Sequence, residues 1–100
     1  MQTISAAELK SRIDAGEKIN LLDVREPAER SEFNIGGVHI PLGKIQTLQT
    51  EEIDELKNEE LIVYCRSGNR SGMASLFLEQ MGFANVKNLT GGMLAWKEMK

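Results

Sequence analysis

The segment CRSGNRS, residues 65–71, contains the only cysteine of the chain, with an arginine directly after it and a second four residues later. It follows the apolar run LIVY and precedes GMASLFLEQMG, which has the composition of a helix. A tight loop between a strand and a helix turns successive backbone N–H groups inward, and the helix adds the positive end of its dipole. A thiol in such an anion-binding nest ionises more readily than a free cysteine, which makes Cys65 a candidate nucleophile.

The ordinary alternative is that a lone cysteine at the end of an apolar strand belongs to the core, as free cysteines commonly do. The rest of the loop favours the nucleophile. Its small and polar residues permit tight backbone curvature, and its two arginines would be unusual neighbours for a core side chain but suit an oxyanion. The residues that we expect to bind the substrate are Arg66, Ser67, Gly68, Asn69 and Arg70.

Attack at phosphorus and attack at sulfur both use such a cradle. Four residues separate Cys65 from Arg70, which is a shorter loop than cysteine-dependent phosphatases use around a tetrahedral phosphate. The short loop therefore favours a smaller target, such as a terminal sulfur approached end-on.

The elements that must position this loop alternate along the chain. Continuous apolar runs at 18–24 and 61–65 predict strands covered on both faces, with shorter extended pieces at 36–42 and 84–89. Ser5 and Glu8 form a capping-box pattern ahead of a first helix. Helices are predicted at 6–16, 27–33, 46–58 and 71–80, and the segment 90–100 is predicted to form a turn at Gly91-Gly92 that leads into a final helix.

This alternation predicts an α/β fold with a mostly parallel sheet. Ligands of such sheets gather beyond the carboxyl ends of the strands, where Cys65 and Asp23 would both lie. In the helix at 71–80 we expect Met73, Leu76, Phe77 and Met81 to face inward, and in the segment 46–58 we expect Leu48, Ile53 and Leu56 to be buried.

Size and composition limit the function classes. The chain has 100 residues, of which 41% are apolar, and a formal net charge of −3. We expect one domain spanning 1–100, with no broad basic surface for nucleic acid and no membrane span. One cysteine cannot form an internal disulfide, and the first residues lack a secretory pattern, so we expect a cytoplasmic protein, although a mature chain whose signal had been removed would look the same.

Taken together, four motifs resemble the single-domain rhodanese, or thiosulfate sulfurtransferase-like, family. They are LLDVREPAER (21–30), HIPL (39–42), CRSGNRS (65–71) and LTGGMLAWK (89–97). The resemblance implies a central parallel sheet of about five strands flanked by helices on both faces. It also implies that Cys65 accepts sulfur and that the loop from Arg66 to Arg70 cradles the resulting persulfide.

The same resemblance implies supporting roles for Asp23 and Arg25, which match the family's Asp-x-Arg segment, and for Ser71 at the end of the loop motif. We expect Asp23 to anchor an arginine or backbone amides, and Arg25 either to pair with a carboxylate such as Glu26 or Glu29 or to face the pocket mouth. The position of His39 relative to Pro41 departs from the family pattern, and we expect that ring to be half-buried and hydrogen-bonded.

The function implied by the resemblance is sulfur transfer from a small sulfur-containing anion such as thiosulfate to a thiol, cyanide or protein thiol, with no metal and no organic cofactor. Two alternatives stay open: a persulfide carrier or protein-docking module with little turnover, and a cysteine-dependent phosphatase.

Overall fold

The computed structural model describes residues 1–99, so the last residue of the expected final helix, Lys100, lies outside the described residues. One sheet with the strand order β1-β5-β4-β2-β3 forms the centre of the molecule, and every pairing within it is parallel. The expected α/β fold with a parallel sheet of about five strands is confirmed. The strands are β1 (Gln2–Ile4), β2 (Leu21–Asp23), β3 (Val38–His39), β4 (Glu60–Tyr64) and β5 (Asn85–Leu89).

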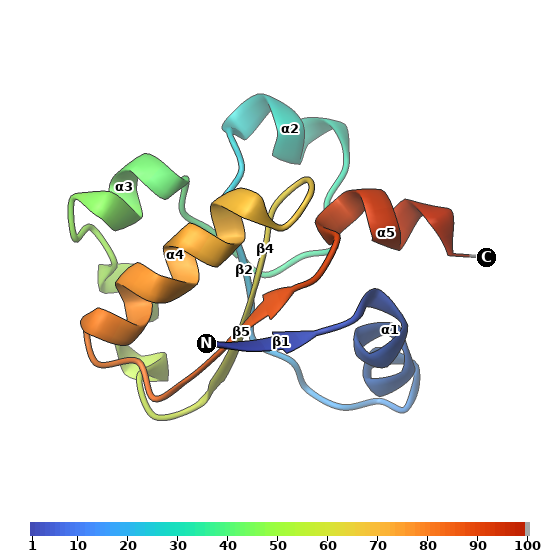
Figure 1. The fold of residues 1–100 in the computed structure, drawn as a ribbon, viewed down its shortest axis with the longest axis horizontal. Coiled ribbons are helices and arrows are strands. Elements are labelled where there is room, and N and C mark those ends of the chain that lie inside the picture. Colours follow the sequence, from blue (N-terminus) through green and yellow to red (C-terminus); the bar gives the residue numbers. More distant parts are fainter. Residues whose placement is uncertain (100) are drawn as a thin grey trace.

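Helices cover both faces of this sheet (Figure 1). In that view α3 and α4 lie on one side, α1 and α5 lie on the other, and α2 lies above the ends of β2 and β4. The helices are α1 (Ala6–Asp14), α2 (Pro27–Glu32), α3 (Leu42–Gln46), α4 (Asn69–Gln80) and α5 (Gly92–Glu98), with a 3-10 helix η1 (Glu51–Leu56).

Strand β4 shows why the sequence gives two cores. Side chains alternate between the faces of a strand. Leu61 and Val63 therefore join the core cluster that includes Ala74 of α4, whereas Ile62 and Tyr64 join the cluster that includes residues of α1 and α5. A run that is apolar at every position thus fits a strand buried on both faces, and it ends at Cys65.

The single helix expected at 46–58 is wrong. The chain instead forms α3, turns at Leu48, and continues as η1. Leu48 has a φ of 62° and is 63% exposed, whereas Ile53 is fully buried. A left-handed residue between the two segments prevents one continuous helix, so only part of the expected apolar stripe reaches the core.

The buried face of α4 also differs from the expectation. Met73 and Leu76 are about half exposed, at 48% and 51%, and Phe77 and Met81 are only partly buried against the core. The buried positions of this helix are Ser71, Ala74, Ser75 and Leu78. Small residues let α4 approach the sheet closely, so its inner face is less apolar than its sequence pattern suggests.

Two local features at the N-terminus have different outcomes. The capping box of Ser5 and Glu8 is confirmed, since each side chain accepts a hydrogen bond from the backbone of the other. Strand β1 was not expected, because it is only three residues long and buries only Ile4. No helix within residues 1–99 is both long enough and apolar enough to cross a bilayer.

Candidate active site

Strand β4 delivers Cys65 to the carboxyl edge of the sheet, and the residue is fully buried there. Three donors converge on its sulfur. The amide of Gly68 lies 3.1 Å from Sγ, and the amide and the hydroxyl of Ser71 each lie 3.3 Å from it. The residue is therefore in the core by burial, but its sulfur sits among hydrogen-bond donors, as the anion nest requires.

The loop can turn this tightly because of Gly68, whose φ of 102° is unfavourable for a residue with a side chain. Helix α4 starts directly after it, at Asn69, which is two residues earlier than expected. The first-turn amide of Ser71 consequently donates to the sulfur, as does the amide of the N-cap residue Gly68, and the positive end of the helix favours an anion there.

The pKa of the Cys65 thiol reflects two opposing effects. Burial raises this pKa, but the hydrogen bonds from the hydroxyl and amide of Ser71 and from the amides of Gly68 and Ser67 lower it by more. The pKa therefore lies below that of an ordinary cysteine, so the thiolate is favoured relative to a free thiol.

Asn88, in β5, completes this arrangement and was not identified from the sequence. Its Oδ1 accepts a hydrogen bond from the Ser71 hydroxyl, and its Nδ2 donates to the carbonyl of Gly68 at 3.1 Å. A serine hydroxyl has one proton, so Ser71 can donate to the Cys65 sulfur or to Asn88 but not to both at once. The signal in the sequence was a polar amide inside a short strand, next to the apolar residue Leu89.

The pair Gly91-Gly92 was expected to form a turn, and the structure adds a packing role. Both glycines have positive φ, 75° and 52°. A Cβ on Gly92 would lie 2.7 Å from the carbonyl oxygen of Arg66 and would also overlap the carbonyl of Cys65. The amides of Met93 and Leu94 donate hydrogen bonds to these same two carbonyls, so the start of α5 packs directly against the loop that contains Cys65.

Arg70 belongs to the first turn of α4 and is paired with a carboxylate. Its guanidinium donates to both oxygens of Glu29 in α2, at 2.7 and 2.8 Å. This pairing lowers the pKa of Glu29 to about 2, and it raises the pKa of Arg70 above its usual value. The structure therefore fixes the Arg70 guanidinium at one end of the loop in a neutral pair, and contact of Arg70 with a substrate stays a prediction.

The other loop residues are more accessible. Arg66 and the side chains of Ser67 and Asn69 are exposed, and within residues 1–99 none of these three side chains forms a hydrogen bond. Arg66 is one of the residues that line a cleft of about 280 Å³ between α2 and α5. The substrate-binding roles expected for these side chains stay predictions, whereas the backbone of the loop is positioned around the sulfur.

Asp23, at the end of β2, is fully buried and lies among arginines. Its carboxylate accepts two hydrogen bonds from the Arg25 guanidinium, both at 2.9 Å, and one from Arg30 at 3.3 Å. Arg25 also donates to the carbonyl of Phe33 and lies over the ring of Tyr64. Arg25 thus pairs with Asp23 rather than with Glu26 or Glu29, and it also lines the cleft.

His39 is half-buried, and its Nε2 is 2.7 Å from the carbonyl oxygen of Arg25. No hydrogen bond within the described residues joins its ring to Cys65. The hydrogen bonds to the Cys65 sulfur within residues 1–99 come from two amides and a hydroxyl. Among residues 1–99 there is no cluster of three or more histidine, cysteine or carboxylate side chains that could hold a metal ion.

Comparisons with known proteins agree on one family. The model of the Rhodanese-like domain matches residues 5–99. The chain is 42% identical to the "Putative sulfurtransferase YtwF" of Bacillus subtilis, over 97% of this chain and 91% of that protein. It is 40% identical to the "Putative sulfur carrier protein YrkF" of the same organism, over 93% of this chain and 49% of that protein, so it spans about half of that relative.

Among solved structures, a rhodanese-like domain protein from Staphylococcus aureus superimposes with a TM-score of 0.84 at 29% identity. The match covers 96% of this chain and 91% of that one.

Proposed function

The chain belongs to the rhodanese-like domain family, and on this premise we propose that it is a sulfurtransferase that carries sulfane sulfur on Cys65. The observation that supports this most directly is the convergence of two amides and one hydroxyl on the Cys65 sulfur. These donors stabilise the thiolate before the reaction. The same loop would stabilise the negative charge on the outer sulfur of a persulfide afterwards.

In the first half-reaction the Cys65 thiolate attacks the outer sulfur of thiosulfate. A bond forms between Sγ and that sulfur, and the sulfur–sulfur bond of thiosulfate breaks. The electron pair of the broken bond leaves with sulfite, and the protein retains a Cys65 persulfide anion. No proton transfer is required in this step if the cysteine is already ionised, which agrees with its lowered pKa.

In the second half-reaction a thiolate or cyanide attacks the outer sulfur of the persulfide. The bond to Sγ breaks, and the cysteine leaves as a thiolate, ready for another donor. The two half-reactions share one covalent intermediate, so we expect ping-pong kinetics.

The two arginines have different roles in this proposal. Arg70 is paired with Glu29, which fixes its guanidinium at the end of the loop. Arg66 is exposed and free to meet an incoming anion. The expected donor is a small sulfur-containing anion, and the expected acceptors are a low-molecular-weight thiol, cyanide or a protein thiol.

The test is to incubate the protein with thiosulfate and measure its intact mass. We expect the mass of one sulfur atom to be added to the wild type and none to Cys65→Ser. Arg70→Ala should load more slowly, whereas Arg12→Ala, which removes an arginine paired with Glu60 away from the loop, should load at the wild-type rate. A wild type that takes up no sulfur, or one that hydrolyses aryl phosphates without taking up sulfur, would overturn the proposal.

A sulfur-carrier role is a second candidate, which the name of YrkF favours. A carrier would load in the same way but release its sulfur to a particular partner only. Turnover with thiosulfate and several small acceptors distinguishes the two roles, because a carrier would give one loading event and little turnover.

A further inference from the structure

The cleft beside the active-site loop is larger than the proposed inorganic donor or cyanide requires. It has a volume of about 280 Å³ and lies between α2 and α5. It meets both ends of the loop, because Arg66 lines it directly and Glu29, which also lines it, holds Arg70. A water molecule accounts for roughly 30 Å³ of liquid volume, so the cleft has room for a small organic molecule.

The charges of the cleft divide into paired and unpaired groups. Arg25 and Glu29 are neutralised by Asp23 and by Arg70, respectively. Within residues 1–99, the lining side chains that form no ion pair are Arg66, Glu32 and Lys97. These three carry a net positive charge, so the cleft favours a ligand with a negative group.

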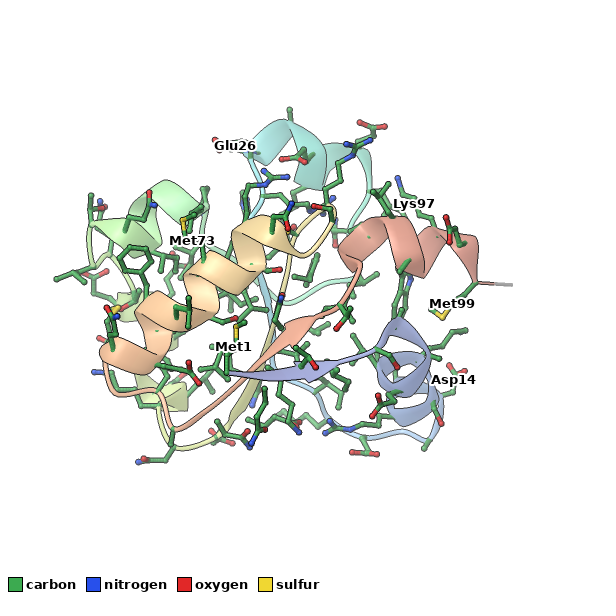
Figure 2. The ribbon with its side chains drawn as sticks, viewed as in Figure 1. Met1, Asp14, Glu26, Met73, Lys97 and Met99 are labelled. Atoms are coloured by element: carbon green, nitrogen blue, oxygen red, sulfur yellow. The ribbon has the colours of Figure 1, made fainter. Side chains whose placement is uncertain are left out.

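The position of Lys97 is defined by an aromatic contact. Its ammonium group lies 4.8 Å from the centroid of the Phe33 ring, which holds it on the side of α5 that faces the end of α2. Figure 2 labels Lys97 on this side of the helix. A cation is attracted to an aromatic face, so the ring favours a position of the Lys97 ammonium beside Phe33, and both residues line the cleft.

The remaining wall of the cleft is apolar. Phe33 and Leu94 line it with accessible surface, and Leu94 is 44% exposed, whereas Met93 lies behind them in the core at 2% exposure. Thiosulfate and cyanide have no hydrocarbon part to contact such a wall. An alkyl chain does, and its burial there would be favourable.

We propose that the cleft binds the organic part of the sulfur acceptor and that this acceptor is a low-molecular-weight thiol bearing a carboxylate. The methylene groups contact Phe33 and Leu94, and the carboxylate contacts Lys97 and Arg66. Of these two cations, Arg66 belongs to the loop around Cys65 and Lys97 does not. Lys97 is therefore a specificity-determining residue. This inference rests on the proposed sulfur transfer.

The chemical step is the discharge of the persulfide. The thiolate of the acceptor attacks the outer sulfur and forms a new sulfur–sulfur bond. The bond between that sulfur and Cys65 breaks, and its electron pair remains on Sγ as the thiolate. The product is the persulfide of the acceptor, and no external oxidant or reductant is needed.

Three thiols with the same two-carbon chain test the role of charge: 3-mercaptopropionate, 2-mercaptoethanol and cysteamine, which carry a carboxylate, a hydroxyl and an ammonium. The protein is loaded with thiosulfate, freed of excess donor and mixed with each thiol, and the loss of persulfide is followed by intact mass. The measured quantity is the ratio of the rate constants for 3-mercaptopropionate and 2-mercaptoethanol. Comparing this ratio between variants cancels the intrinsic reactivity of each thiol.

We expect Lys97→Gln to lower this ratio by about threefold and Lys97→Glu by about tenfold, the range of one exposed ion pair and of its reversal. Lys97→Glu should also raise the relative rate with cysteamine. Added salt should reduce the discrimination of the wild type, because exposed charges are screened. The matched control is Lys18→Glu, an exposed lysine before β2 at the opposite edge of the sheet, which should leave the ratio unchanged.

Discharge that does not depend on the charge of the thiol would overturn the inference, as would an equal effect of Lys97→Glu on all three thiols or an effect confined to loading. Each of these results leaves the proposed function intact, because loading and discharge are still observed. Failure of Cys65 to load at all would instead overturn the proposed function, and this inference with it.

Discussion

A carboxylate that is hydrogen-bonded to cationic side chains lies near each end of strand β4. We call each such group a clamp, and the two clamps connect different parts of the molecule. At its start, Glu60 accepts hydrogen bonds from Arg12 of α1 and Lys87 of β5. Beyond its end, Glu29 of α2 accepts two from Arg70 of α4. In both cases hydrogen bonds from the cation lower the carboxyl pKa to about 2.

The electrostatics of the two clamps are thus alike, but their surroundings are not. The clamp at Glu60 joins α1, β4 and β5 and has no nucleophile beside it, whereas the clamp at Glu29 fixes one end of the loop around Cys65. A carboxyl group with a lowered pKa therefore does not by itself identify the end of the sheet that carries the candidate active site. That end is identified by the hydrogen-bond donors directed at the Cys65 sulfur.

The largest expected difference between the two edges concerns the buried carboxylate Asp23. Asp23→Asn would leave the Arg25 guanidinium buried without its counter-ion, so we expect a loss of about 3–5 kcal/mol in the free energy of unfolding. Glu60→Gln, at a carboxylate that is more exposed than Asp23, should cost about 1 kcal/mol or less. Urea denaturation of both variants measures this difference, and equal losses would contradict the importance we assign to burial at the active edge.

The next effect concerns glycines with positive φ. In Gly92→Ala the new Cβ would overlap the carbonyl groups of Cys65 and Arg66. We therefore expect a loss of about 2–4 kcal/mol in the free energy of unfolding and slow sulfur uptake. Gly16 also has positive φ, 84°, but a Cβ there meets no atom within 4 Å. Gly16→Ala should therefore cost only about 1–2 kcal/mol of backbone strain and leave sulfur uptake unchanged. Similar uptake by the two variants would show that α5 does not support the loop.

A smaller effect on the rate of sulfur uptake is expected when the carboxylate of either clamp is replaced by an amide. Glu29→Gln weakens the hold on Arg70, so we expect persulfide formation with thiosulfate to slow by about tenfold. Glu60→Gln is the matched control, and its rate should stay within about twofold of the wild type. The second-order rate constant of Cys65 loading measures both. If the two substitutions slowed loading equally, the clamp at Glu29 would have no special connection to the site.

The smallest effect is a shift in pH dependence. Alkylation of Cys65 by iodoacetamide follows the thiolate, and its midpoint should lie below the pKa of an ordinary cysteine. Ser71→Ala removes a donor that favours the anion, so the thiolate forms less readily and the midpoint should rise by about one pH unit. Ser75→Ala removes a hydroxyl from the same helix that bonds the carbonyl of Ser71 rather than the sulfur, and it should leave the midpoint in place. A midpoint insensitive to Ser71→Ala would mean that the amides alone ionise the cysteine.

Much of the fold followed from local patterns. Residues 61–65 are apolar at every position, so β4 could be placed as a strand buried on both faces. The single helix predicted at 46–58 is wrong, because Leu48 adopts a left-handed conformation that the apolar pattern of the segment does not indicate. The inner face of α4 was misjudged for a related reason, since serine and alanine are buried there where close approach to the sheet favours small side chains.

The candidate active site also has one part that could be predicted from the sequence and one part that could not. The loop around Cys65 was predictable because its residues are contiguous and a tight strand-to-helix turn forces its amides inward. The partners Asn88 and Glu29 were not, because they lie 17 and 41 residues from the loop residues that they bind. No local pattern carries that information.

The amino-acid sequence by itself thus determined the alternation of strands and helices, the family, and the identity of the one candidate nucleophilic thiol, because each of these depends on neighbouring residues. Tertiary structure alone decided which carboxylate holds Arg70, which amide meets Ser71, and which glycine lies beneath the loop. Hydrogen bonds and steric contacts act over a few ångströms in space, and only the folded sheet brings β5, α2 and α5 to the same edge.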